Sequence, residues 1–491
     1  MALIELKLPP GVKQHGTDLQ SEGRWRDANL VRWTEGEPGP VGGWVERMSS
    51  AYAAAPRGML AWEDQSDNRW IAAGTYNKLY VTNAAGTTSD ITPVGLSAGT
   101  EDASVNTGYG GELYGTDFYG QPRPDTGNYG EATTWSMDSW GQYLVACSVD
   151  DGDIYEWQLN TGTIAAAVTN APTNCRGLVV TQERFVFALG AGNNPKRVEW
   201  CDREDNTTWT AAATNEAGGQ DLQTTGKIMQ GIKYQDEVLI LTDTDAHTAT
   251  YQGPPYVYGF RKVGNACGAI SQRGAASVDE GVFWMGQNGF FQYSGGQVQR
   301  LQCDVEDYVF DDIIKHYGRL VHAVSNTKHG EIWWFYPADD FPCDSYVCYN
   351  YRHGYWTFGE MDRAAGVDVG VFEFPIYATG VGALYKHETG NAYGGATIYA
   401  ETGPITLGAG DQVMCATELI PDELTQGDVT ATFKTRFHPN DTERSYGPYT
   451  MANPTSVRFT GRQVRMRITG SELDDWRVGV NRLDVTPGGR R

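Results

Sequence analysis

The chain repeats one pattern of apolar and polar positions several times. Each copy has a short run of β-branched and aromatic residues, a turn of Gly, Asp or Asn, and a second run that ends in an aromatic residue. Such runs between turn residues are typical of antiparallel β-strands. The copies lie at residues 69–81, 143–157, 184–200, 236–251, 281–293, 331–349 and 375–385.

The spacing of the copies indicates how the strands are organised. From residue 143 onward, successive copies are separated by 41, 53, 45, 49 and 45 residues. A period of about 40–50 residues with several strands per unit is the signature of a β-propeller blade. Radial stacking buries sheets that would be marginal alone. We therefore predict an all-β chain whose main part is a β-propeller of six or seven blades. A pair of β-sandwiches fits the strands but not the spacing.

The two ends of the chain differ from this repeat. Residues 1–58 cluster Trp and Arg, and we expect an extended docking segment there. The propeller is then expected over residues 59–398. Beyond it, apolar and polar residues alternate, which is typical of half-buried antiparallel strands and predicts a β-sandwich-like domain over residues 399–491. The alternating segments are residues 429–437, 456–460, 463–469 and 476–484.

The first repeat interval is too long, and the excess is a Gly- and Tyr-rich insertion at about residues 95–134. Long loops in compact proteins are usually functional or disordered. The insertion is either a flexible surface segment or a projecting loop that contacts a channel or a neighbouring subunit. Its candidate contact residues are Tyr109, Tyr114, Phe118, Tyr119 and Tyr129.

Charge limits the possible partners. The 491 residues carry a formal net charge of −23, which excludes a protein that holds nucleic acid on a general basic surface. Most of the acidic excess lies in residues 51–400. Residues 431–470 are the basic exception, and they predict either a solvated strand face or a docking surface for an acidic neighbour. No window is long and apolar enough to span a bilayer, and the start of the chain lacks a secretory signal.

The sequence contains no recognisable catalytic or metal-binding motif. The eight Cys are scattered and the eight His do not fall at metal-ligand spacing, so we expect reduced thiols, no metal and no cofactor. Ser148-Val-Asp-Asp-Gly-Asp-Ile-Tyr155 resembles the Asp box of sialidase-like propellers. That box is a turn device, so it favours the fold rather than an enzyme, and we predict no catalytic residues.

Both ends of the chain carry characteristic sequence strings outside the repeat. The N-terminal strings are Leu8-Pro-Pro-Gly11, Asn29-Leu-Val-Arg-Trp33 and Pro40-Val-Gly-Gly-Trp44. The C-terminal strings are Gly461-Arg-Gln-Val-Arg-Met-Arg467, Asp475-Trp-Arg-Val-Gly479, Arg482-Leu-Asp484 and Gly488-Gly-Arg-Arg491, and residues 61–93 match in kind. Together they resemble the tail nozzle (hub) proteins of short-tailed bacteriophages, some of which are named packaged-DNA stabilisation proteins.

The resemblance implies a structural virion protein of the tail that is assembled in the host cytoplasm. It implies a homo-oligomeric ring, expected to be hexameric, below portal and adaptor proteins and next to tail fibre, needle or plug proteins. The central duct would retain packaged double-stranded DNA and pass it at ejection without binding it tightly. An acidic wall suits that task because it repels phosphates. We therefore expect the surplus acid of residues 51–400 to line or flank the duct.

Arg and Trp are enriched at interface hot spots, which makes the N-terminal cluster a candidate subunit contact. The candidates are Arg24, Trp25, Arg32, Trp33 and Trp44. The alternative is that these tryptophans are core anchors. Two other functions stay open for the whole chain: a carbohydrate- or receptor-binding propeller, and a glycan hydrolase with a carboxylate pair in one cleft.

Overall fold

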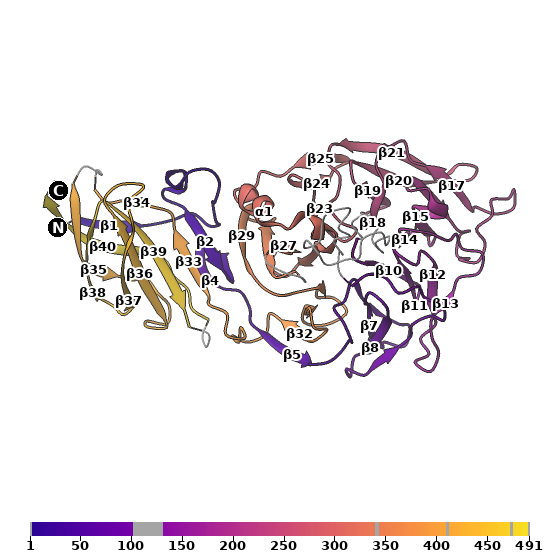
Figure 1. Cartoon of the computed structure of the whole chain (residues 1–491), viewed down its shortest axis with the longest axis horizontal. Coiled ribbons are helices and arrows are strands. Elements are labelled where there is room, and N and C mark those ends of the chain that lie inside the picture. Colours follow the sequence, from indigo (N-terminus) through magenta and orange to yellow (C-terminus); the bar gives the residue numbers. More distant parts are fainter. Residues whose placement is uncertain (1, 102–130, 339–342, 409–411, 472–474, 490–491) are drawn as a thin grey trace, which may run out of the picture.

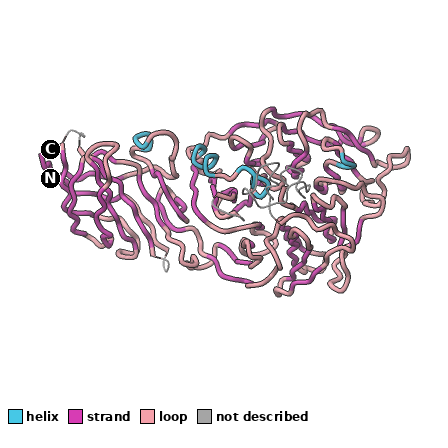
Figure 2. Tube along the Cα trace, viewed as in Figure 1, coloured by secondary structure: helices cyan, strands magenta, loops and turns pink. Residues whose placement is uncertain are grey.

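The computed structural model describes residues 2–101, 131–338, 343–408, 412–471 and 475–489. Nearly all regular structure in them is β-strand, with a few short helical turns (Figure 2). A propeller forms one end of the elongated molecule and a two-sheet sandwich forms the other (Figure 1). The expected contact residues Tyr109, Tyr114, Phe118, Tyr119 and Tyr129 lie outside the described residues.

Seven four-stranded antiparallel sheets make up the propeller, within the predicted range of six or seven blades. Blades one to four consist of β6 (Met59–Glu63), β7 (Arg69–Gly74), β8 (Leu79–Asn83) and β9 (Thr88–Asp90); β10 (Trp135–Trp140), β11 (Tyr143–Ser148), β12 (Ile154–Trp157) and β13 (Ala166–Ala167); β14 (Gly177–Val180), β15 (Val186–Leu189), β16 (Arg197–Trp200) and β17 (Gly218–Asp221); and β18 (Ile228–Tyr234), β19 (Glu237–Thr242), β20 (Asp245–Gly253) and β21 (Val257–Asn265).

Blades five to seven consist of β22 (Ala275–Val278), β23 (Gly281–Met285), β24 (Phe290–Ser294) and β25 (Gln297–Arg300); β26 (His322–Asn326), β27 (Glu331–Tyr336), β28 (Ser345–Asn350) and β29 (Tyr355–Glu360); and β30 (Ala365–Val367), β31 (Ile376–Ala378) and β32 (Leu384–His387) with β5 (Trp44–Met48). The first strands of neighbouring blades contact one another in a closed ring, from β6 through β30 and back to β6. These first strands therefore surround the propeller axis.

The repeat seen in the sequence corresponds to the second and third strands of each blade. In blade six, every residue of β27 is buried, and in blade five every residue of β23 is buried. Strands covered on both faces are continuously apolar, which explains why they stand out in the sequence. Some outer strands are short and largely exposed, as in β25 and β13.

The ring is closed by the N-terminal part of the chain. β5 pairs antiparallel with β32 as the outer strand of blade seven, and Trp44 lies opposite His387. This pairing joins the first fifty residues to the end of the propeller, so residues 1–58 supply a strand to the sheet that closes the ring.

The sandwich also combines both ends of the chain. One sheet has the order β1 (Ala2–Leu6), β40 (Asn481–Gly489), β35 (Val413–Ile420), β38 (Thr455–Gly461). The other has the order β2 (Trp25–Asn29), β33 (Tyr399–Thr402), β39 (Gln463–Gly470), β36 (Val429–Arg436), β37 (Arg444–Thr450), with β34 (Ile405–Thr406) beside β39. β1 and β2 thus belong to different sheets of one sandwich.

Some elements differ from the predicted ones. The last strand begins at Asn481 rather than at residue 476, because the preceding residues turn away to bind elsewhere: Val478 N–H donates to the Pro38 carbonyl and Gly479 N–H to the Asp422 carbonyl. Pro38 belongs to a small hairpin of β3 (Val31–Thr34) and β4 (Glu37–Pro40). The helical elements are η1 (Asp18–Ser21), η2 (Ala191–Asn193), α1 (Glu306–Asp312) and η3 (Lys315–Leu320).

Candidate functional site

Residues 29–33, which follow β2 of the sandwich, join the sandwich to blade six. The Asn29 carboxamide accepts the Glu360 N–H at 2.9 Å, and the Tyr346 hydroxyl accepts the Leu30 N–H at 2.9 Å. The Tyr355 hydroxyl donates to the Trp33 carbonyl at 2.9 Å. These partners come from β28 and β29, so the string is a rigid joint between two bodies.

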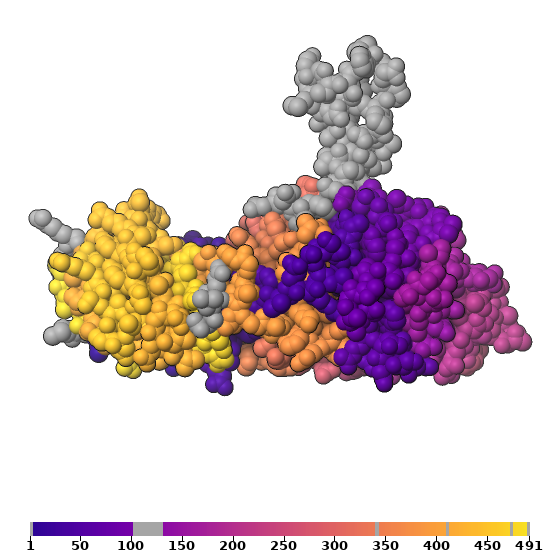
Figure 3. All heavy atoms as spheres, turned by 90° about the horizontal axis from the view of Figure 1, so that it is seen from below, coloured from indigo at the N-terminus to yellow at the C-terminus, as the bar shows by residue number. Residues whose placement is uncertain are grey.

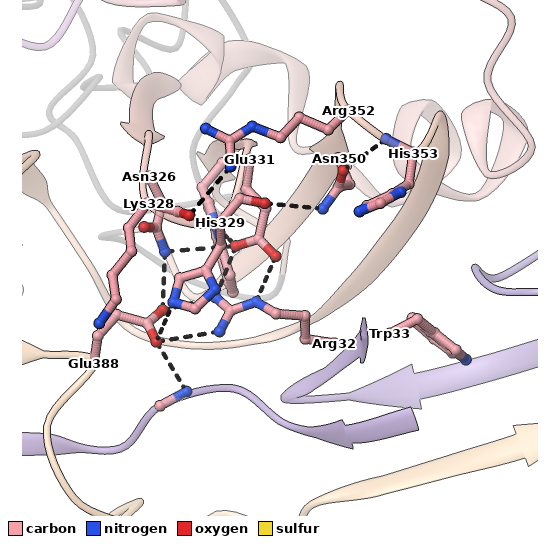
Figure 4. A network of polar contacts seen from close by, with 12 residues as sticks. Arg32, Trp33, Asn326, Lys328, His329, Glu331, Asn350, Arg352, His353 and Glu388 are labelled. Carbon is pink, nitrogen blue, oxygen red and sulfur yellow. Dashed lines mark hydrogen bonds and ion pairs between the residues drawn. The ribbon is translucent and has the colours of Figure 1, made fainter. Parts of the chain in front are cut away.

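Arg32 is the centre of a buried polar network in this joint (Figure 4). Its Nε and Nη2 donate to the two carboxylate oxygens of Glu331 at 2.6 and 2.8 Å. Its Nη1 and Nη2 donate to Glu388 at 3.1 and 2.7 Å. Asn326 and the Gly42 N–H complete the set by donating to Glu388 at 2.9 and 3.2 Å.

Electrostatics hold Arg32 and Glu388 in their charged forms. Burial acts to lower the pKa of Arg32, but Glu331 and Glu388 raise it well above its ordinary value. Burial acts to raise the pKa of Glu388, but Arg32 and His329 hold it well below its usual range. These ion pairs therefore connect β3 to blades six and seven.

The five candidate subunit-contact residues lie mostly inside the chain. Trp25 and Trp33 are buried with their rings 6.2 Å apart, and Arg32 is 8% exposed. Trp44 is partly covered, stacking on His387 under the Arg363 guanidinium. Arg24 keeps more exposure and pairs with Asp304 at 3.3 Å. Buried side chains offer little surface to a second copy, so Trp25, Arg32 and Trp33 serve as core anchors in this structure.

The basic region at residues 431–470 is largely paired within the sandwich. Arg436 and Arg465 both contact Asp18 of η1, at 2.7 and 2.5 Å. Lys434 pairs with Glu401 at 2.7 Å, and Arg467 approaches the same carboxylate at 3.6 Å. Four of the seven basic side chains thus have acidic partners in their own chain. The sequence had suggested either a solvated strand face or a docking surface for an acidic neighbour, and it did not suggest this internal pairing.

A second group of cations surrounds one mouth of the propeller axis, and sequence reasoning missed it. Six of the seven blades carry a basic residue one to three positions before their first strand: Arg57, Arg176, Lys227, Arg273, Arg319 and Arg363. Arg363 turns outward, over Trp44 and Tyr385. The repeat phase could have revealed the others, because equivalent positions before inner strands meet at one end of a propeller.

Blade two supplies a carboxylate to this ring of cations. Glu131 lies 3.0 Å from Arg319, 3.1 Å from Lys227 and 3.8 Å from Arg176. Burial acts to raise its pKa, but these cations hold the pKa below the ordinary value. One carboxylate is therefore shared by three basic side chains that come from three different blades.

The base of the insertion is fastened at the same mouth. The Thr100 hydroxyl donates to the Glu131 carbonyl at 2.6 Å, which joins the two described edges of the insertion. Arg57 donates to the Glu101 carbonyl at 2.8 Å. Asp150 and Asp151, in the sequence that resembles an Asp box, accept the N–H groups of Thr100 and Ser97 at 3.4 and 2.8 Å. This turn thus anchors the insertion at the axis.

A cavity of about 200 Å³ runs along the axis between the first strands. Its polar lining includes Arg273, His322, Gln230, Gln272 and Asp138. Arg273 lies at the basic mouth, since it is coupled electrostatically to Arg57 and His322. Asp138 is paired with Lys233 at 2.9 Å.

Within the described ranges, no three His, Cys, Asp or Glu side chains gather into a group that could hold a metal ion. All eight cysteines are free, and seven are buried. Among the helices that the structure describes, none has the length and apolar character needed to cross a membrane.

Comparison with known proteins finds similarity of fold and no similarity of sequence. No family model and no curated protein matches the sequence. Solved structures with a similar fold include virginiamycin B lyase from Staphylococcus aureus, at TM-score 0.42 and 8% identity over 70% of this chain and 97% of that chain. YCF48 bound to D1 peptide has TM-score 0.41 and 8% identity, over 74% and 97% of the two chains. At these values neither bears on function.

Proposed function

We propose that the chain is a structural subunit of a short-tailed bacteriophage tail, in the nozzle or hub position. The proposal rests on the sequence resemblance at the two ends of the chain. It assigns the protein to a ring of copies around a duct that retains packaged DNA and passes it at ejection. The partners are further copies of this chain, the adaptor and portal above, and the fibre, needle or plug proteins nearby.

The observation that supports the proposal most is where the resembling strings lie. Residues 29–33 dock the sandwich on blade six through the Asn29, Leu30, Arg32 and Trp33 contacts. In the C-terminal strings, Arg465 pairs with Asp18, and Val478 N–H binds the Pro38 carbonyl. The strings thus build and join two bodies, and a rigid elongated subunit suits a load-bearing ring (Figure 3).

The charge distribution also supports a duct. Each copy carries −23, and several cations of the propeller are gathered at the axis mouth, where Glu131 pairs with two of them. A ring of six copies would carry six times that charge. A wall of net negative charge repels DNA phosphates over about 8 Å at physiological salt, so the duplex stays mobile.

Solution mass of the purified full-length chain tests the proposal, with negative-stain imaging of any oligomer. We expect a closed ring with a central hole wide enough for a duplex, alone or after addition of the adaptor–portal complex. A chain that stays monomeric with that complex present would overturn the proposal. Binding to a glycan array by such a monomer would then favour the carbohydrate-binding propeller.

A further inference from the structure

In the part of the chain that the structure describes, the axial cavity combines an Arg whose buried Nε has no partner and a buried imidazole without a partner on one nitrogen. Arg273 donates through Nη1 to the Ala364 carbonyl at 3.2 Å and through Nη2 to the Leu320 carbonyl at 3.3 Å. Its buried Nε has no hydrogen-bond partner, and no carboxylate of the described residues pairs with it. Buried charges normally have partners, so this one stands out.

His322 lies beside Arg273 and lines the same cavity. It is 3% exposed, its Nδ1 hydrogen-bonds to the Leu320 carbonyl at 3.3 Å, and its ring stacks on Phe335. Its Nε2 is buried and has no hydrogen-bond partner among the residues that the structure describes. An unpaired nitrogen of this kind next to an unpaired Arg Nε provides two atoms that a polar ligand can satisfy.

The sign of the local charge selects an anion. Burial lowers the pKa of Arg273 to about 9, and the nearby Arg57 contributes to that shift, so the guanidinium is still charged at neutral pH. The acidic groups nearby are already paired: Glu131 with Arg319 and Lys227, and Asp138 with Lys233. Among the described residues, Glu131 and Asp138 are therefore both committed to other cations.

We propose that the axial cavity binds one small oxyanion of the sulfate or phosphate type, held by Arg273 and His322. The cavity of about 200 Å³ has room for such an ion with part of its hydration shell, given that a water occupies about 30 Å³. Gln230 and Gln272, which also line the cavity, are neutral donors beside this pair. The inference does not depend on the proposed role in a phage tail.

The bound anion is expected to change the protonation of His322. In the free protein, burial and then Arg273 hold the pKa of His322 well below its ordinary value, so Nε2 carries a lone pair. The groups facing it are Arg273 and Arg57, with Cys343 beside Arg273. An anion offsets the two cations, so Nε2 takes up a proton and donates it to the ligand. Binding should therefore strengthen as pH falls.

Titration calorimetry of the full chain with sodium sulfate tests the site, with sodium chloride at matched ionic strength as the reference. Sulfate keeps its charge between pH 5.5 and 8, so any pH dependence belongs to the protein. We expect one site per chain, with affinity that rises toward pH 5.5. Arg273→Gln should weaken binding by about tenfold or more, the value of one charge-assisted hydrogen bond. His322→Gln should flatten the pH dependence.

Arg203→Gln is the matched control, because Arg203 is exposed and does not line the cavity. It should leave the sulfate affinity within about twofold, as expected for a screened surface charge. Equal loss in Arg203→Gln and Arg273→Gln, or no saturable binding by the wild-type chain, would overturn the proposal. Selenate soaked into crystals of the wild-type chain gives a readout that needs no variant: an anomalous peak beside Arg273 supports the site, and an empty cavity contradicts it.

Discussion

Arg32 and Glu331 form a buried two-point ion pair, at 2.6 and 2.8 Å, although 299 residues separate them in the chain. Arg32 precedes the propeller in sequence and Glu331 begins the second strand of blade six. The pair therefore joins two parts of the chain that lie far apart in sequence. A buried pair of this kind adds little to stability by itself, but its loss leaves charges without partners.

Arg32→Met should destabilise the protein by about 3–5 kcal/mol, since it removes the cation that the buried carboxylates of Glu331 and Glu388 share. Chemical denaturation followed by tryptophan fluorescence measures the change. Arg69→Met is the control, because the Arg69–Glu63 pair is exposed and should contribute less than about 1 kcal/mol. A triple variant that also carries Glu331→Gln and Glu388→Gln should recover part of the loss. Equal stability of Arg32→Met and Arg69→Met would contradict the prediction.

Removal of residues 1–58 should prevent formation of the native monomer. The truncated chain loses β5, which leaves β32 as an exposed edge, and it also loses β1 and β2 from the sandwich. Exposed edges pair with other chains. We expect aggregation in size-exclusion chromatography, whereas removal of residues 1–6 alone should leave the propeller closed. A soluble monomer with native circular dichroism after the longer truncation would argue against closure by β5.

Acid should destabilise the fold through two buried histidines. His322 and His387 are buried, and burial followed by the neighbouring cations Arg273 and Arg363 lowers each pKa well below the usual value. The unfolded chain then binds more protons than the folded chain below about pH 6.5, so stability falls as pH falls through that value. The melting temperature between pH 7.5 and 5 measures this, and His322→Gln should reduce its slope. A melting temperature that does not change over this range would refute the interpretation.

One thiol should react much faster than the others. Cys415 is the partly exposed cysteine, while burial raises the pKa of the other seven, among them Cys147, Cys303 and Cys348. Reactivity follows the accessible thiolate. Ellman's reagent should label one thiol rapidly in the native protein and eight after unfolding. Cys415→Ser should remove the fast phase, and its persistence in that variant would show that a buried thiol opens.

The strands that sequence analysis identified are those covered on both faces. β23 and β27 consist of buried residues throughout, and their apolar runs set the period from which the propeller was predicted. First strands mix small, polar and apolar residues: β14 begins with Gly177, and β10 contains Ser136, which lines the axial cavity. Their weaker pattern is why the blade number stayed open between six and seven.

The joint and the axial site could be predicted only in part. One of the two interpretations of the N-terminal cluster made Trp25 and Trp33 core anchors. The partners of Arg32, in contrast, lie about 300 residues away, and no local sequence pattern predicts them. The cations at the axis mouth are single residues, each in the turn before a different first strand. They become a cluster only when the ring closes, so a search for local charge runs passes over them.

Closure of blade seven by β5 also determines when the propeller ring can close during synthesis on the ribosome. β5 is synthesised before every blade, yet the Arg32–Glu388 contact beside it spans 356 residues. The first blades can stack while the chain is still emerging, but the ring stays open until its last blade has left the exit tunnel. Until then the early strands β1, β2 and β5 lack their partners. Such non-local pairing slows folding and exposes sheet edges, so this protein should depend on chaperones during synthesis more than a propeller closed by neighbouring strands.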